Sequence, residues 1–281
     1  MASSGRSWEY VACLADGTAL ADGRGVDVVL LQEALRPTSV PNRWRIVPDR
    51  ADDAAWSTAA SLPRKFTTAV VVCDQSRDVE PLPVVPVNDP AYSGGQVLAA
   101  SHLGTFRPVR LTDGDQSMIV VSTYGLQDDK TAYSKTSYAM TTLHRTLSDL
   151  TPLLHGPQGR RVILGGDLNA GTQYWQGRLL DSWSETLWQR VVQFGLTDCL
   201  PAFVPTDRGG LERCACGGGA GCRHTLTSRV RRANARPWEN DHLLTMPGIH
   251  VLCCFAANGP DSLAWSYSDH CPVVADIEVV K

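Results

Sequence analysis

Short runs of β-branched and other apolar residues recur along the chain and alternate with segments of helical periodicity. These runs predict strands at 26–31, 68–73, 117–123, 161–164, 250–255 and 272–280. Leucines spaced three or four apart between Leu143 and Leu154 predict a helix over 134–155. A similar pattern predicts a helix over 179–194, which Gly195 is placed to end in the left-handed conformation. Strands and helices mixed at these intervals favour an α/β or α+β sandwich.

The composition fits a single globular domain. Of the 281 residues 43% are hydrophobic, which excludes a disordered chain, and 26 basic against 29 acidic residues exclude a wholly basic binder. No repeat and no long linker divides the sequence, so we expect one domain over 1–281. No apolar stretch is long enough for a membrane span, and Glu9 and Asp16 interrupt the region where a signal peptide would be apolar. We therefore expect a cytoplasmic, monomeric protein.

Residues with active-site chemistry stand where the apolar runs end. Glu33 directly follows the first run, and burying its carboxylate is costly unless a positive partner such as a metal ion lies beside it. In the segment VILGGDLNA two glycines allow the backbone to leave the sheet, and Asp167 and Asn169 are expected to point the same way from an extended segment. Together they can orient a water and hold a phosphate oxygen. Taken singly, an acid at a strand end is more often a turn residue or a cap.

The order of such residues along the chain is more informative than any one of them. Asp241 begins a further strand candidate, and Asp269 and His270 precede the last one. The motifs LQE, STYG, GGDLN, ND and SDH occur in that order, and GGDLN followed much later by SDHCPV is the most specific part. With these spacings the sequence resembles the endonuclease/exonuclease/phosphatase superfamily of deoxyribonuclease-I-like, metal-dependent phosphoesterases. The resemblance implies a four-layer αββα sandwich of two mixed, mostly antiparallel sheets packed face to face, with helices outside.

The resemblance also implies roles at the metal and at the histidine. Glu33 matches the principal metal-binding Glu of the family, and Asp269 matches an Asp near the metal, which would be Mg²⁺ or Mn²⁺. His270 matches the histidine that contacts the scissile phosphate, and Asp241 matches the acid that orients it. An acid bonded to His270 would fix its tautomer and raise its pKa. Because Mg²⁺ keeps several waters, one or two carboxylates are sufficient to hold it.

Three further matches concern the phosphate and the water. Asp167 matches the group proposed to activate or align the attacking water, and Asn169 matches an amide of the phosphate site. Tyr124 of STYG falls where many members place a Tyr or His that contacts phosphate. Phosphate ester hydrolysis needs charge neutralisation, an in-line water and a stabilised leaving oxygen, and these residue types can supply them.

One family feature is absent from the sequence. Members begin with a strand that ends in an active-site Asn, ahead of the first helix. Residues 1–6 are polar and too few for that strand, and 8–14 already has the pattern of the first helix. We therefore expect the sandwich to lack its first strand, either because another part of the chain replaces it or because the start codon lies downstream of it.

A Cys/Gly/Arg-rich insertion loop is expected at about 207–237. Cys214, Cys216, Cys222 and His224 have the ligand types of a structural Zn²⁺ site, and the glycines between them allow a tight loop. The alternative is a flexible Gly-rich loop with incidental cysteines. A disulfide framework is not expected in the cytosol, so the other cysteines are assigned to the core or its border, namely Cys13, Cys73, Cys199, Cys253, Cys254 and Cys271.

The segment 223–236 contains five arginines and no acid. Such a charge beside a phosphate site would attract a polyanion, and we expect Arg229, Arg231 and Arg232 to reach DNA or RNA phosphates. A solvated surface loop is the alternative.

Three functions remain open from the sequence. The first is a metal-dependent phosphoesterase, with nucleic acid as the favoured substrate because of the arginines. The second is a phosphatase or phosphodiesterase acting on a small molecule or a lipid headgroup. The third is an inactive protein that uses the zinc and arginine loop for binding. No NTPase, serine-hydrolase or dinucleotide motif occurs.

Overall fold

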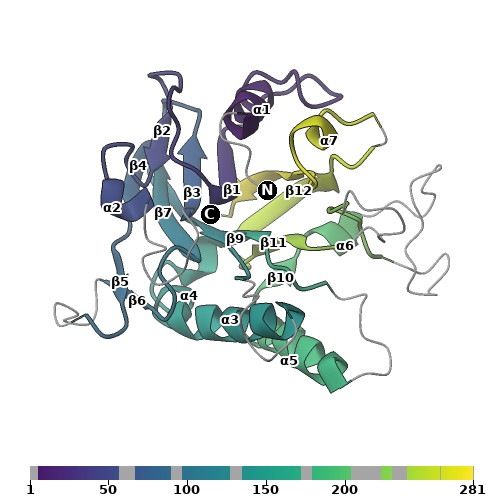
Figure 1. The fold of residues 1–281 in the computed structure, drawn as a ribbon. Coiled ribbons are helices and arrows are strands. Elements are labelled where there is room, and N and C mark those ends of the chain that lie inside the picture. Colours follow the sequence, from purple (N-terminus) through teal and green to yellow (C-terminus); the bar gives the residue numbers. More distant parts are fainter. Residues whose placement is uncertain are drawn as a thin grey trace.

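Two layers of β-sheet lie between two layers of helix (Figure 1). The computed structural model describes residues 6–56, 67–89, 97–126, 135–171, 179–203, 223–229, 239–259 and 261–280. One outer layer holds α3 (Lys135–Asp149) and α5 (Leu179–Gln193), and the other holds α1 (Arg6–Ala15) and α7 (Ala264–Tyr267). The predicted four-layer αββα sandwich is confirmed.

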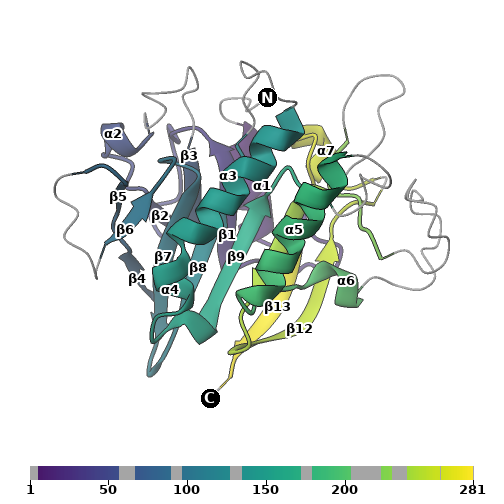
Figure 2. The same ribbon diagram turned by 90° about the horizontal axis from the view of Figure 1, so that it is seen from below.

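The larger sheet has six strands and carries α3 and α5 on its outer face (Figure 2). Its order is β10 (Thr197–Asp198), β11 (Asp241–Thr245), β9 (Val162–Asp167), β8 (Gln116–Thr123), β7 (Phe106–Asp113) and β4 (Asp78–Pro81). Only the β8 and β9 pair is parallel, and the other neighbours are antiparallel. The sheet is therefore mixed and mostly antiparallel, as expected.

The second β layer consists of two separate sheets among the described residues. One has the order β1 (Val28–Ala34), β3 (Thr67–Val72), β2 (Arg45–Val47), and the other pairs β12 (Ile249–Ala256) with β13 (Val273–Val279). Strands β1 and β13 do not pair with each other, so the layer is interrupted between them.

Smaller elements complete the described fold. A parallel pair is formed by β5 (Val84–Pro86) and β6 (Leu98–Ala100). The short helices are α2 (Asp53–Trp56), α4 (Thr151–Leu154) and α6 (Leu200–Phe203), with a 3₁₀ turn at Gly159–Arg161. None of the helices in the described ranges is both long enough and apolar enough to pass through a lipid bilayer.

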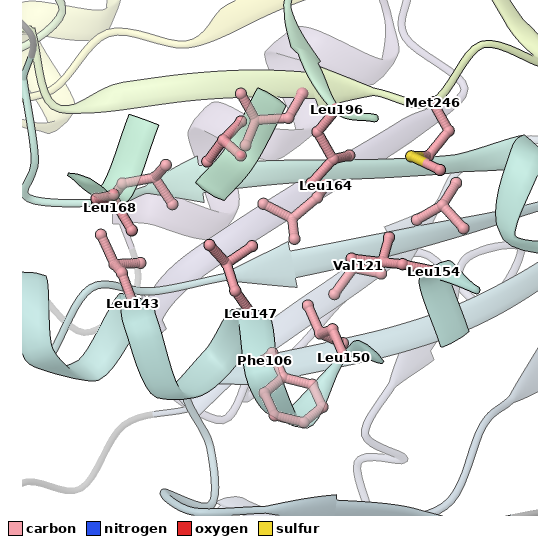
Figure 3. Close-up of a cluster of buried hydrophobic side chains, with 14 of the residues drawn as sticks. Phe106, Val121, Leu143, Leu147, Leu150, Leu154, Leu164, Leu168, Leu196 and Met246 are labelled. Atoms are coloured by element: carbon pink, nitrogen blue, oxygen red, sulfur yellow. The ribbon is translucent and has the colours of Figure 1, made fainter. Parts of the chain in front are cut away.

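Two large apolar clusters hold the layers together. Leucines from α3, including Leu143 and Leu147, pack on Val121 and Leu164 of the six-stranded sheet (Figure 3). Between the β layers, valines of β3 meet residues of β8 and β9, including Val120 and Ile163. Burying such side chains contributes about 1.5–3 kcal/mol each, which makes these clusters the main source of stability.

The expected helix over 134–155 is divided in two. α3 ends at Asp149 and α4 begins at Thr151. Pro152 stands in the first turn of α4, where its missing N–H does no harm but where it could not continue a longer helix. The second expected helix is α5, and Gly195 does adopt the left-handed conformation, with φ of 82°.

The glycines of VILGGDLNA do not let the chain leave the sheet, because both lie within β9. A Cβ on Gly166 would lie 1.9 Å from the carbonyl oxygen of Thr123, and one on Gly165 would lie 2.8 Å from Leu243. Glycine is therefore needed here because neighbouring groups approach the strand closely.

Candidate active site

One cavity of about 1790 Å³ brings the predicted catalytic and magnesium-site residues together. Its lining includes Glu33, Tyr124, Asp167, Asn169, Asp241, Asp269 and His270. These residues come from both β layers, so the cavity lies where the layers meet. Sequence order alone could not have placed Glu33 opposite residues more than 90 positions away.

A histidine between two carboxylates forms the centre of the site. Asp241 on β11 lies directly opposite Asp167 on β9 in the sheet register. His270 Nδ1 donates to Asp241 Oδ2 at 2.8 Å, and its Nε2 lies 4.0 Å from Asp167 Oδ2. Like charges directly opposite are destabilising in a sheet, so the imidazole offsets their repulsion. The predicted orientation of His270 by Asp241 is present in the geometry.

Burial and charge shift the pKa values of this group. Burial alone would lower the pKa of His270, but the carboxylates of Asp241 and Asp167 outweigh it and raise that pKa to about 10. Burial is the largest influence on Asp167 and raises its pKa to about 7, with the charge of His270 opposing it. The imidazole is therefore positively charged near neutral pH.

Glu33 reaches the cavity because β1 is irregular at its end. The pairing of β1 with β3 shifts register between Leu31 and Ala34, and Glu33 has a φ of 50°. Bulges of this kind redirect a side chain, and a left-handed non-glycine residue marks local strain. The hydroxyl of Tyr124 donates to Glu33 Oε1 at 2.6 Å. Tyr124 thus positions a carboxylate, a contact that the sequence did not indicate.

Asn169 is not extended as predicted. It has a φ of 49°, and its backbone N–H donates to Asp167 Oδ1 at 2.9 Å. Its side-chain amide donates to the carbonyl of Gly125 at 2.8 Å and lies 3.3 Å from Asp167 Oδ2. The two residues do converge as expected, but through a tight turn that aspartate and asparagine favour.

Thr227 is a site-supporting residue that sequence reasoning missed. It is fully buried, and its Oγ1 accepts hydrogen bonds from the backbone N–H groups of Asn240 at 3.1 Å and Asp241 at 3.0 Å. Its carbonyl accepts from the N–H of Cys271 at 2.8 Å. One residue therefore holds both chain segments that carry the Asp241–His270 pair. No local pattern marks such a contact.

The expected zinc and arginine loop lies mostly outside the described residues. Cys214, Cys216 and Cys222 fall there, as do Arg231 and Arg232. His224 is described and is half-buried. The backbone N–H of Arg229 donates to the carbonyl of Asp269 at 2.7 Å, and its guanidinium lies 4.4 Å from the ring centroid of Trp265. The remaining six cysteines are free thiols, of which Cys199, Cys254 and Cys271 are buried and the others half-buried.

The donor set fits a divalent cation that prefers oxygen. Asp241, Asp167 and Asp269 all act on the charge of His270, and Glu33 acts on Asp167, so the carboxylates in this cavity outnumber its one imidazole. Carboxylate oxygens of Asp167 and Asp241 lie within 4.8 Å of each other. An excess of carboxylates in a cavity is stabilised by a bound cation, and hard cations such as Mg²⁺ take carboxylate ligands.

Solved structures share the fold of this chain. It is similar to the endonuclease domain of TRAS1, a telomere-specific non-LTR retrotransposon, at 18% identity over 96% of this chain and 94% of that one, with a TM-score of 0.55. The 3′ phosphatase NExo from Neisseria, bound to a product DNA hairpin, has 16% identity over 97% and 94%, with a TM-score of 0.57. The catalytic domain of human Nocturnin with bound sulfate has 14% identity over 97% and 87%, with a TM-score of 0.54.

No protein-family model matches the sequence, and no curated protein matches it either. The likeness to the solved structures is one of fold. The chain therefore has the deoxyribonuclease-I-like fold of the endonuclease/exonuclease/phosphatase proteins, in agreement with the motifs LQE, STYG, GGDLN, ND and SDH.

Proposed function

We propose that the protein is a divalent-metal-dependent phosphoesterase and that its substrate is nucleic acid. The observation that carries the proposal is His270 between Asp241 and Asp167, with Glu33 in the same cavity. An imidazolium, a carboxylate that can align water, and several carboxylates that can hold a metal ion can together catalyse the cleavage of a phosphate ester. The fold is one that the endonuclease TRAS1 and the phosphatase NExo also have.

Each residue has a role in the proposed reaction. Asp167 aligns the attacking water and accepts its proton, because its carboxylate faces the cavity and is held by Asn169. His270 holds the charge that develops on the phosphate oxygens, and Asp241 fixes the ring. Glu33 and Asp269 would hold the cation, with Tyr124 bonded to Glu33. A bound cation would supply charge neutralisation for the phosphate ester.

Nucleic acid is the favoured substrate for two reasons. The segment 223–236 carries five arginines, and the backbone N–H of one of them, Arg229, donates to the carbonyl of Asp269 in the site. NExo was solved with a product DNA hairpin. Replacing Arg229, Arg231 and Arg232 by Ala should weaken binding and flatten its salt dependence, because phosphate contacts release counterions. An unchanged salt slope would contradict this role.

Zinc is the second proposed metal, with a structural role in the loop. Cys214, Cys216, Cys222 and His224 are the proposed ligands, and such a site would shape the loop so that its arginines face the substrate. Measurement of zinc in the purified protein decides the matter. About one zinc per chain is expected, and a value near zero would rule the site out.

The class of substrate is tested with a panel of phosphate esters. DNA, RNA, inositol phosphates and sphingomyelin are each incubated with the protein and Mg²⁺, with EDTA as the control. We expect Mg²⁺-dependent hydrolysis of DNA or RNA. Turnover of inositol phosphates or sphingomyelin alone would favour the small-molecule or lipid phosphatase instead. Binding of nucleic acid without turnover of any substrate would favour the inactive binding protein.

A further inference from the structure

A groove in the outer helical layer is lined by polar and basic residues. It encloses about 540 Å³ beside α3 and α5, which Figure 2 shows next to each other on the six-stranded sheet. Four hydroxyl residues, one histidine and two arginines line it, namely Ser101, Thr141, Ser148, Thr186, His144, Arg145 and Arg190. We call it the α3–α5 groove. It shares no lining residue with the candidate active site, which lies where the two β layers meet.

Arg190 of α5 is fixed against α3. Its Nη1 donates to the carbonyl of His144 at 2.9 Å and to His144 Nδ1 at 3.0 Å, and its Nη2 donates to Ser148 Oγ at 3.0 Å. A guanidinium can only donate, so Nδ1 is the acceptor and the imidazole is uncharged in this arrangement. The guanidinium carbon also lies 5.7 Å from the ring centroid of Phe194, within cation–π range. The guanidinium is therefore held in place before any ligand binds.

Arg145 of α3 also has an imidazole beside it. Its Nη1 lies 3.5 Å from His102 Nε2. Burial lowers the pKa of His102 and the charge of Arg145 lowers it further, against the charge of Asp149, so this ring is uncharged at neutral pH. The oxygens of Asp149 accept from Ser101, at 2.7 Å from its backbone N–H and at 2.9 Å from its hydroxyl. The acid nearest to His102 in this list of influences is thus engaged by a residue other than Arg145.

The charge of the two arginines is not balanced by an ion pair. In the part of the chain that the structure describes, neither Arg145 nor Arg190 pairs with a carboxylate, whereas Arg24 and Arg110 each do. A carboxylate would cancel the charge of a guanidinium, but a neutral imidazole or a carbonyl leaves it in place. Two guanidiniums with uncancelled charge in one groove create a positive potential that attracts an anion.

The groove fits a single phosphate group better than a polynucleotide. Guanidiniums bind phosphate oxygens through paired N–H groups, and hydroxyls can donate to the remaining oxygens. A polynucleotide needs positive charge along a track, but none of the exposed α5 residues in the described range is basic, and Glu185 among them is acidic. A volume of about 540 Å³ lies within the range of about 300–1,000 Å³ that is typical of small-ligand sites. Because the lining is polar, the ligand is a charged one.

We propose that the α3–α5 groove is a binding site for the phosphate group of a small molecule, held by the guanidiniums of Arg145 and Arg190 and by the hydroxyls around them. Inorganic phosphate and phosphomonoesters share this group, and both are tested. Since the groove is separate from the candidate active site, the proposal does not depend on the proposed phosphoesterase activity.

Binding is measured by isothermal titration calorimetry in a chloride buffer with EDTA, so that no metal ion at the candidate active site recruits phosphate. The ligands are inorganic phosphate, a nucleoside 5′-monophosphate and an oligonucleotide without terminal phosphates. Arg145→Gln and Arg190→Gln should each weaken binding of the first two ligands by about 10- to 100-fold, the usual effect of losing hydrogen bonds to a charged group. Arg160→Gln, which replaces an exposed arginine of the 3₁₀ turn, is the matched control and should bind like the unaltered chain.

Arg145→Gln keeps the test decisive if Arg190→Gln loses stability, because Arg145 is exposed and has one hydrogen-bond contact among the described residues. Equal affinities in Arg145→Gln and Arg160→Gln would overturn the proposal. Loss of phosphate binding in His270→Ala would also overturn it, since the anion would then occupy the candidate active site. So would binding of the oligonucleotide alone.

The source of the phosphate follows from the same titrations. A lower Kd for the nucleoside monophosphate than for inorganic phosphate, lost in Arg145→Gln, would support the proposal with an ester as the ligand. Equal Kd values, likewise raised in Arg145→Gln, would support it with the free ion as the ligand.

Discussion

The hydroxyl of Tyr124, a residue predicted to contact phosphate, is bonded to Glu33, a residue predicted to bind the metal ion. Its hydrogen bond to Glu33 Oε1 is 2.6 Å long, and the residue is 4% exposed, so the carboxylate has a fixed partner. Residues that orient a metal ligand typically contribute 10- to 100-fold to metal affinity. We therefore expect Tyr124→Phe to raise the Mg²⁺ concentration for half-maximal activity by about 10- to 100-fold.

The matched control for this prediction is Tyr10→Phe. The hydroxyl of Tyr10 is buried and finds no hydrogen-bond partner in the described part of the chain. Its removal should leave the Mg²⁺ requirement unchanged. Equal Mg²⁺ requirements in Tyr124→Phe and in Tyr10→Phe would show that the Glu33 contact does not support metal binding.

Thr227 is a positioning residue for the Asp241–His270 pair. In Thr227→Val the volume is kept, but the backbone N–H groups of Asn240 and Asp241 lose their acceptor. Since small displacements of catalytic groups can cost about 100-fold, kcat should fall by about 10- to 100-fold with little change in KM. Thr227→Ser should restore kcat. If Thr227→Val lowers only Tm and leaves kcat intact, the role of Thr227 is structural.

Residues of the site were predictable to different degrees. Asp167 and His270 stand beside apolar runs, where a charged group is unusual, and this local signal made them visible in the sequence. Thr227 gave no such signal, because threonine is common in loops and its bonds reach 13 and 14 residues along the chain. The tight turn at Asn169 was missed for a similar reason, because the residue type alone does not say whether the backbone is extended or left-handed.

At the scale of elements, β10 and β11 are joined by a buried ionic contact. His242 on β11 has a side chain that is 0% exposed, and its Nδ1 lies 2.8 Å from Asp198 Oδ2 on β10. Burial lowers the pKa of His242, but Asp198 chiefly, with Glu239 and Asp241, outweighs it and raises the pKa to about 9. The folded state therefore binds a proton more tightly than the unfolded chain, whose histidine pKa is about 6.5.

This contact predicts a pH dependence of stability. Because the folded pKa is the higher one, the stabilisation is complete below about pH 6.5 and is lost as the pH rises through about 9. Asp198→Asn should reduce the free energy of unfolding by on the order of 2 kcal/mol at pH 6, and by much less at pH 9.5. Urea unfolding of both proteins at the two pH values measures the difference. A deficit of equal size at both values would contradict the prediction.

Elements were predictable where one residue type dominated. The strands β3, β8 and β12 and the helix α5 follow from β-branched runs and from helical spacing. β7 was missed because Arg107, Pro108 and Arg110 interrupt its apolar residues. Pro108 is tolerated because its carbonyl accepts from the N–H of Leu82, just past the end of β4, so the side that lacks an N–H faces no residue of that strand.

At the scale of the whole molecule, the site exists only because two β layers meet. The six-stranded sheet supplies Asp167 and Asp241, β1 supplies Glu33, and the turn before β13 supplies His270. The order of motifs predicted this assembly through family resemblance. That β1 and β13 belong to separate sheets is visible only in three dimensions. The single-domain organisation over 1–281 remains a prediction.

The most direct test of the proposed active site is the rate of Mg²⁺-dependent phosphodiester hydrolysis in His270→Ala. His155→Ala, which changes an exposed histidine packed on Phe194, is the matched control. We expect His270→Ala to lose about 100- to 10,000-fold in kcat, with His155→Ala unchanged. Full activity of His270→Ala, or no hydrolysis by any of these proteins, would contradict the proposed active site.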